Sequence, residues 1–172
     1  MPTGRSPSTK KRADNGKSRK SGKAVQRRAS LGHLTELIGY AVRRAQLAIF
    51  RDFRRSFDEF KIRPIQYGVL TVIEANPGLK QIEVCAALGI KRANFVHLIN
   101  ELERRGLAER RSAEDQRANS LHLTRQGKTL MTKLRDINRQ HEQRAATNLT
   151  EKERGQLINL LNRIRTSTGE DR

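Results

Sequence analysis

The sequence has few of the residues that build cross-linked, metal-bound or membrane-spanning proteins. Its 172 residues include one cysteine, Cys85, and no tryptophan. A lone cysteine forms no intramolecular disulfide and leaves the common zinc ligand pairs incomplete. No apolar run reaches the roughly 18 residues of a bilayer-spanning helix, and no apolar stretch follows the basic N-terminus as in a secretory signal. We therefore expect a protein of a reducing compartment with no metal, no other cofactor and no membrane partner.

Acidic residues are also scarce relative to basic ones. The chain has 36 Lys+Arg and 18 Asp+Glu, a formal net charge of +18, which favours a polyanionic partner. Residues 1–30 hold ten of the basic residues and a single acid, Asp14, with almost nothing apolar to bury. This composition predicts a disordered basic tail. Residues 31–172 still hold 26 basic and 17 acidic residues, so the folded part is basic as well.

The first part of the folded chain predicts two helices. Apolar residues recur at intervals of three and four along residues 31–60, and the stripe ends in four phenylalanines. Pro64 suits the first turn of a second helix. The turn signal Asn76-Pro77-Gly78 closes that helix. Its expected inward residues are Ile65, Val69, Leu70 and Ile73.

Residues 82–105 have the pattern of a helix-turn-helix. A short helix ends at Gly89, and a longer helix over residues 91–105 is closed by Gly106, since glycine readily takes the left-handed conformation there. We expect two sets of inward residues: Ile82, Val84, Cys85 and Leu88 on the first helix, and Phe95, Leu98, Ile99 and Leu102 on the second. The outward face of the second helix is polar and basic. Its predicted DNA contacts are Lys91, Arg92, Asn94, His97 and Asn100. The alternative is a solvated amphipathic helix without a ligand.

Two alternating segments, residues 107–111 and 120–124, predict a β-hairpin with a polar loop between them. Arg117 in the loop suits the narrow minor groove of DNA, where negative potential is concentrated. Asp115 can hold its guanidinium extended. Arg110 and Arg111 on the first strand complete the predicted DNA-contacting set. The alternative for the loop is an exposed ion pair of little energetic value.

Two further helices complete the fold. One covers residues 125–149, and the other begins after Thr150, whose capping partner is Glu153. The apolar face of the last helix consists of Leu157, Leu160, Leu161 and Ile164. The predicted fold is mainly α with a small β-hairpin wing (α+β), in which residues 64–124 form a winged helix-turn-helix flanked by helices.

Over residues 31–166 this arrangement resembles the MarR family of transcriptional regulators. The segments that carry the resemblance are Arg63-Pro64-Ile65-Gln66-Tyr67, Leu88-Gly89-Ile90, residues 98–107, Asp115-Gln116-Arg117-Ala118, Leu121-His122-Leu123-Thr124 and Gly127. Members are homodimers, usually repressors released by a small ligand. The resemblance implies a cytoplasmic, nucleoid-associated regulator of a bacterium or archaeon that binds a pseudo-palindromic operator in double-stranded DNA.

The resemblance also assigns roles to segments of the chain. Residues 31–60 and 125–166 would be dimerisation helices that interlock with those of a second copy, and residues 167–172 a C-terminal tail. Residues 91–97 would read the major groove, while Arg117 enters the minor groove with support from Asp115.

The aromatic stripe of the first helix has two interpretations. The simpler is core and dimer contact. Effectors of this family, however, bind between the first-helix region and the winged domain, so Arg54, Phe57 and Tyr67 are candidates to line such a pocket. An apolar wall beside a guanidinium suits an aromatic carboxylate or its CoA thioester.

No residue set indicates catalysis or redox sensing. Cys85 lies on an apolar helix face, which favours core packing, and the family's peroxide-sensing branch has its cysteine in the first helix, where this chain has none. The four histidines have no metal-ligand spacing, and no catalytic triad or phosphate loop is recognisable. We therefore expect that the protein is not an enzyme.

An architectural DNA-binding protein, driven by its basic tail, remains the alternative function, and deleting residues 1–30 separates the two. For a sequence-specific regulator, deletion lowers affinity and its salt dependence but preserves the preferred site, because phosphate contacts carry no sequence information. For an architectural protein, deletion abolishes binding. The measurement is a footprint and competition titration at two salt concentrations on the DNA flanking the protein's own gene.

Overall fold

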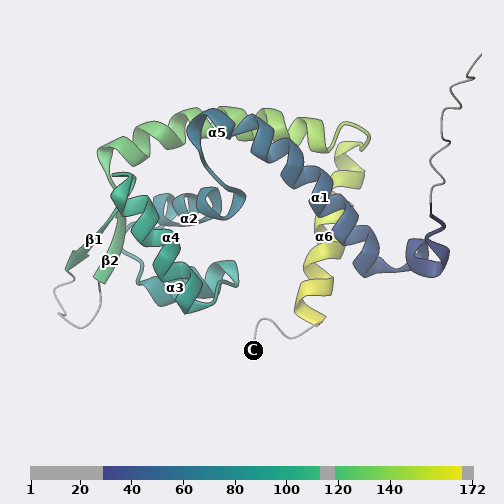
Figure 1. The fold of residues 1–172 in the computed structure, drawn as a ribbon, viewed down its shortest axis with the longest axis horizontal. Helices are drawn as coiled ribbons and strands as arrows, with labels where there is room; N and C mark the ends of the chain where they lie inside the picture. The colour runs from purple at the N-terminus through teal and green to yellow at the C-terminus, as the bar shows by residue number, and fades with distance from the viewer. Residues whose placement is uncertain (1–28, 113–118, 168–172) are drawn as a thin grey trace, which may run out of the picture.

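The computed structural model describes residues 29–112 and 119–167, and these form a mainly helical fold with one β-hairpin. The elements are η1 (Gly32–Glu36), α1 (Ile38–Ser56), η2 (Asp58–Phe60), α2 (Pro64–Ala75), α3 (Gln81–Leu88), α4 (Arg92–Arg104), β1 (Ala108–Ser112), β2 (Asn119–Leu123), α5 (Arg125–Ala145) and α6 (Glu151–Ser167). Figure 1 shows α2, α3, α4 and the hairpin gathered in one lobe, from which α1, α5 and α6 extend as an arm. The predicted fold class is confirmed.

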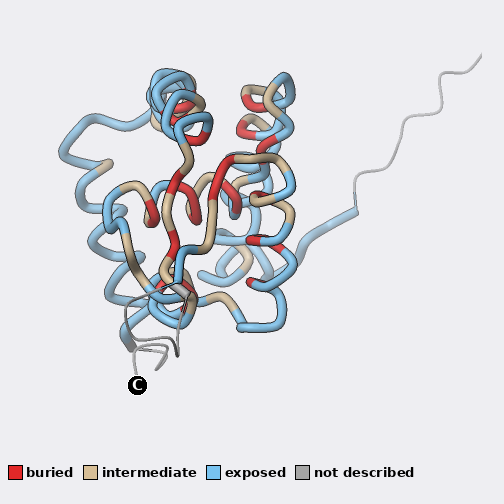
Figure 2. The backbone as a smooth tube through the Cα atoms, turned by 90° about the vertical axis from the view of Figure 1, so that its left-hand side faces the viewer, coloured by how far each residue is buried: buried red, intermediate tan, exposed pale blue. Residues whose placement is uncertain are grey.

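The core joins the lobe to the base of the arm. Its fully buried side chains include Phe57, Val69, Leu70, Ile73, Phe95, Ile99, Leu102, Leu121, Met131 and Leu134. In Figure 2 the buried segments gather in the interior. The rings of Phe53 and Phe57 stack with centroids 3.8 Å apart, and Tyr67 meets Phe57 edge-on at 5.4 Å. These aromatic contacts hold the end of α1 against α2.

The prediction of one continuous helix over residues 31–60 is wrong. Leu37 has an extended backbone and separates η1 from α1, and Phe57 ends α1 before the short η2 turn. Lys61 follows in the left-handed conformation, with φ of 51°. Apolar spacing reports which face of a segment is buried, but it does not show where the backbone stops being helical.

Two expected core residues and several boundaries also differ. Ile65 is 39% exposed and Ile82 is 64% exposed. The eight-residue helix α3 buries Val84 and Cys85, and Ile82 lies outside this buried stripe. The strands are shifted by one residue from the predicted limits, and α5 ends at Ala145 rather than at residue 149.

The predicted helix boundaries marked by turn residues are confirmed. Gly89 and Gly106 both have positive φ, of 61° and 64°. After α4, the N–H of Gly106 donates to the Glu103 carbonyl and the N–H of Leu107 to the Leu102 carbonyl, which is the paired arrangement of a Schellman motif. At the start of α6, the backbone N–H of Thr150 donates to the Glu153 carboxylate at 2.8 Å.

A short turn before α3 extends the hairpin sheet. The Leu121 N–H donates to the Leu79 carbonyl and the Gly78 N–H donates to the Leu121 carbonyl, both at 2.9 Å. A bridge between Lys80 and Ser120 continues this pairing. The turn after α2 therefore holds the wing against the start of α3.

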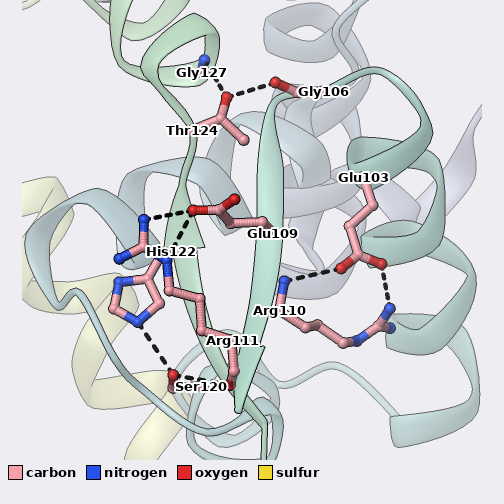
Figure 3. Close-up of polar contacts among 9 residues, drawn as sticks. All are labelled: Glu103, Gly106, Glu109, Arg110, Arg111, Ser120, His122, Thr124 and Gly127. Atoms are coloured by element: carbon pink, nitrogen blue, oxygen red, sulfur yellow. Dashed lines mark hydrogen bonds and ion pairs between the residues drawn. The ribbon is translucent and has the colours of Figure 1, made fainter. Parts of the chain in front are cut away.

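Four residues form what we call the wing junction: Gly106, Leu107, Thr124 and Gly127. The Thr124 hydroxyl donates to the Gly106 carbonyl and accepts a bond from the Gly127 N–H at 3.0 Å (Figure 3). The Thr124 N–H donates to the Leu107 carbonyl at 3.2 Å. The end of α4, both ends of the hairpin and the start of α5 thus meet at one point.

Gly127→Ala should destabilise the fold, because a Cβ at this position would lie 2.0 Å from the Leu107 carbonyl oxygen. That oxygen is backbone and cannot move without displacing the hairpin. We expect a loss of about 1–3 kcal/mol in the free energy of unfolding, typical of overpacking. The measurement is denaturant unfolding at fixed protein concentration.

Gly155→Ala is the matched control, since a Cβ there has nothing within 4 Å in α6. Alanine favours an exposed helix interior over glycine by up to about 1 kcal/mol, so this variant should be neutral or stabilised. Equal unfolding midpoints for the two variants would contradict the tight approach at Gly127.

Candidate nucleic-acid interface

The turn between α3 and α4 sets the direction of the second helix. Gly89 ends α3 in the left-handed conformation, and the N–H of Ile90 bonds back to the Cys85 carbonyl at 2.9 Å. Lys91 is extended and precedes the first turn of α4. The buried stripe of α4, formed by Phe95, Leu98, Ile99 and Leu102, then fixes the rotation of the helix about its axis.

That rotation leaves the opposite face of α4 in solvent. The five predicted contact residues on this helix and its cap are all exposed: Lys91, Arg92, Asn94, His97 and Asn100. They combine positive charge with amide and imidazole groups, which are the side chains that bind phosphates and base edges. The structure thus brings them together on one surface beside the hairpin, and their contact with DNA stays a prediction.

The two arginines of β1 differ in their surroundings. Arg111 pairs with Glu109 on the same strand and is largely exposed. Arg110 instead lies against α4, where its guanidinium bonds to Glu103 (Figure 3) and also to Asn100. Two residues predicted to contact DNA, Arg110 and Asn100, therefore bond to each other. Glu103 was not among the predicted site residues.

Asp115 and Arg117, the predicted minor-groove residues, lie outside the described residues, as does the basic segment 1–28.

The structure brings two of the three candidate effector residues, Phe57 and Tyr67, into edge-on ring contact. Phe57 has no exposed surface and belongs to the core cluster. Its stacking on Phe53 supports the simpler interpretation, core contact. Arg54 is exposed on α1, and Tyr67 is half-buried behind the two rings.

A hollow of about 700 Å³ lies instead between the end of α4 and the first half of α5. Its lining is mostly apolar and is rimmed by cations: Phe60, Leu107, Leu130, Arg105, Arg125 and Lys133, with Gln126 and Thr129. Arg105 closes one side, because its guanidinium donates to the carbonyls of Phe60 and Lys61 at 2.7 and 2.8 Å. Sequence reasoning missed this site because its residues come from three separate segments.

A second unforeseen cluster ties α1 to α5. His141 is buried, and its Nδ1 lies 2.8 Å from the Asp52 carboxylate. Arg144 donates to the same carboxylate at 3.1 Å and to the Ser56 hydroxyl at 2.6 Å. The bonds from His141 and then Arg144 lower the pKa of Asp52 below its ordinary value. No local motif signals a pair that is 89 residues apart.

Cys85 is 8% exposed within the core cluster, as expected for a packing residue. Burial raises the pKa of its thiol, which disfavours the reactive thiolate. Among the described residues, no group of three histidine, cysteine or acidic side chains is placed to hold a metal ion.

A helix-turn-helix with a polar, basic outer face and an adjoining hairpin wing defines a winged helix-turn-helix DNA-binding protein. A sequence model of the MarR family matches residues 60–118. A Thauera aromatica protein described as a transcriptional regulatory protein for the hcr operon is 35% identical over 135 residues, covering 77% of this chain and 81% of that protein. The chain belongs to the MarR family and is a DNA-binding transcription regulator.

Solved structures show the same fold. The transcriptional repressor CouR bound to a 23-mer DNA duplex is 36% identical, with a TM-score of 0.76 over 81% of this chain and 99% of that one. CouR bound to p-coumaroyl-CoA is also 36% identical, with a TM-score of 0.74 over 80% and 98%. BpsR of Bordetella bronchiseptica, at 24% identity and a TM-score of 0.73 over 77% and 96%, shares the fold.

The relatives are transcriptional regulators, which agrees with the expectation that the chain is not an enzyme. None of the described helices combines the length and apolar character needed to cross a bilayer.

Proposed function

We propose that the chain is a homodimeric repressor that binds a pseudo-palindromic operator and is released by a small anionic ligand. The observation that carries the proposal is the exposed, cationic N-terminal half of α4, a helix whose C-terminal half is bonded to the wing. The 36% identity to a repressor bound to a DNA duplex supports the same assignment. In this proposal Lys91, Arg92, Asn94 and His97 contact the major groove. Asp115 and Arg117 keep the minor-groove role that the sequence implies.

The dimer proposal rests on apolar surface on the arm. A groove of about 790 Å³ runs between α1 and α6, lined by Ile38, Ala41, Val42, Leu157, Leu160, Leu161 and Ile164. Of these, Ile38 is 64% exposed and Leu160 is 52% exposed. Contiguous exposed apolar faces mark protein interfaces. A second copy that supplies the same two helices would cover both faces, as an isologous interface requires.

We expect a symmetric footprint on DNA flanking the protein's own gene, with half-sites about 10 base pairs apart, because the two α4 helices of a dimer enter successive major grooves. Asn94→Ala and His97→Ala should each reduce discrimination against altered half-sites by about 1–3 kcal/mol. Asn159→Ala, on the outer side of α6, is the control and should bind like the wild type. Uniform protection without a preferred site would overturn the operator proposal.

The dimer is tested within the same assay. Leu160→Asp should yield a monomer by sedimentation and lose the symmetric footprint, because a buried, unpaired carboxylate opposes the interface. Asn159→Asp adds the same charge on the opposite face of α6 and should remain dimeric. A Leu160→Asp protein that stays dimeric would refute this interface.

We place the proposed effector site in the hollow between α4 and α5 rather than at the aromatic stripe of α1. Phe60, Leu107 and Leu130 supply an apolar surface for an aromatic ring. Arg125 and Lys133 supply charge for a carboxylate or the phosphates of a CoA thioester. A volume of about 700 Å³ lies in the range of small-ligand sites. The binding of p-coumaroyl-CoA by CouR, 36% identical, supports an aromatic acyl thioester as the class.

The hollow also lies where a ligand can influence DNA binding. Leu107 belongs to the wing junction and Arg105 caps α4, whereas Lys133 lies on the arm helix α5. A ligand that contacts both sides would favour one angle between lobe and arm. It would release DNA only if its affinity differs between the two angles, and by linkage DNA would weaken ligand binding by the same factor.

We expect calorimetry to detect p-coumaroyl-CoA binding, and Arg125→Ala and Lys133→Ala each to weaken it about tenfold through loss of a charge-assisted contact. Arg54→Ala removes a cation from the earlier candidate site and should leave affinity unchanged. If Arg54→Ala weakens binding and Lys133→Ala does not, the hollow is the wrong site. If neither p-coumaroyl-CoA nor p-coumarate binds, the ligand class is wrong.

A further inference from the structure

We propose that Arg110 and Glu103 are positioning residues that set the angle between α4 and the wing, rather than direct DNA contacts. The inference rests on the proposed DNA-reading role of α4. Both residues are partly buried, behind the exposed face of α4.

A single carboxylate holds both the backbone and the side chain of Arg110. Glu103 Oε1 accepts the Arg110 backbone N–H at 3.0 Å, and Glu103 Oε2 pairs with the Arg110 guanidinium. The second terminal nitrogen of the guanidinium, Nη2, donates to Asn100 Oδ1 at 2.8 Å. Strand β1 is therefore bonded to two successive turns of α4, and Figure 3 shows the two bonds to Glu103.

The Arg110–Glu103 ion pair is more buried than the neighbouring Arg111–Glu109 pair. The side chains of Arg110 and Glu103 are 21% and 27% exposed, whereas those of Arg111 and Glu109 are 59% and 41% exposed. Water screens the first pair less, so its geometry is held more firmly. Arg110 Nε is also buried and has no acceptor among the described residues. An arginine that reached out to a phosphate would keep this group in solvent.

Through its bond to Asn100, Arg110 affects a side chain on the face of α4 that is proposed to read the DNA sequence. By occupying Oδ1, Arg110 fixes the plane of the Asn100 amide and leaves its Nδ2 group as the donor. Asn100 follows His97 by one helical turn on the exposed face of α4. A change in Arg110 or Glu103 would therefore alter both the angle of the wing and the orientation of Asn100, a DNA contact predicted from the sequence.

A second ion pair braces α4 from the other side, but it is more exposed. Arg63, at the start of α2, pairs with Glu101, and their side chains are 56% and 35% exposed. Glu101 and Glu103 thus connect α4 to α2 and to the wing respectively. The wing contact is the one that includes a backbone group.

The positioning role and a direct phosphate contact predict opposite results for Glu103→Gln. Removing a negative charge near DNA strengthens binding if electrostatics alone matters. Loosening a brace weakens binding to the specific site and leaves binding to scrambled DNA almost unchanged, because phosphate contacts are retained.

The experiment measures dissociation constants of the dimer for its footprinted duplex and for a scrambled duplex over a range of salt concentrations. Glu103→Gln and Arg110→Met should each lower the specific-to-scrambled ratio about fivefold, with no change in salt slope. The double variant should lower this ratio no further than either single variant, because all three proteins lose the same Arg110–Glu103 interaction. Glu109→Gln makes the same charge change in the exposed pair and should keep the wild-type ratio.

Other results would overturn the proposal. A direct phosphate contact would show as equal losses on both duplexes for Arg110→Met, a salt slope smaller by about one, and tighter binding by Glu103→Gln. Amide hydrogen exchange without DNA gives an independent readout. The Arg110 N–H should lose protection in Glu103→Gln but not in Glu109→Gln, and unchanged protection would refute the brace even if no operator is found.

Discussion

The close approach of two backbone segments at the wing junction is the constraint on which the arrangement of this protein depends. The Leu107 carbonyl lies so near Gly127 that a single methyl group would not fit, and it accepts the N–H of Thr124. Because α4 ends, the hairpin begins and ends, and α5 starts within this contact, the angle between α4 and α5 depends on how these few backbone groups meet.

Much of the fold could be predicted because it depends on local chemistry. Proline at a helix start, glycine after a helix and a Thr–Glu capping pair act within one turn of the chain, and Pro64, Gly106 and Thr150 mark the observed ends. Apolar periodicity is less reliable where tertiary contacts decide the outcome. It predicts a single helix where the structure has η1, α1 and η2, and it predicts Ile82 in a core that Val84 and Cys85 already fill.

The candidate site, too, has one part that local sequence patterns predict and another that they do not. The exposed face of α4 could be predicted because burying one stripe of a helix necessarily leaves the other side in water. The partner of Arg110 could not, because the alternation of a strand shows which face a residue occupies but not which acid lies opposite. The hollow and the Asp52–His141 contact join segments far apart in sequence. A single sequence contains no local signal for such pairs.

The long helix α5 connects the wing junction to α1. At its start it is bonded to the wing junction, and near its end His141 and Arg144 hold Asp52 and Ser56 of α1. A buried histidine between an aromatic ring and a carboxylate resists sliding, since any shift leaves polar groups unpaired. In the proposed dimer, therefore, a change in the spacing of the two arms has to be absorbed at the junction end of α5. That end forms the floor of the cationic hollow and carries the wing that Glu103 braces against α4. The ligand site and the orientation of the reading helix would then share one structural element, which is the physical requirement for coupling between them.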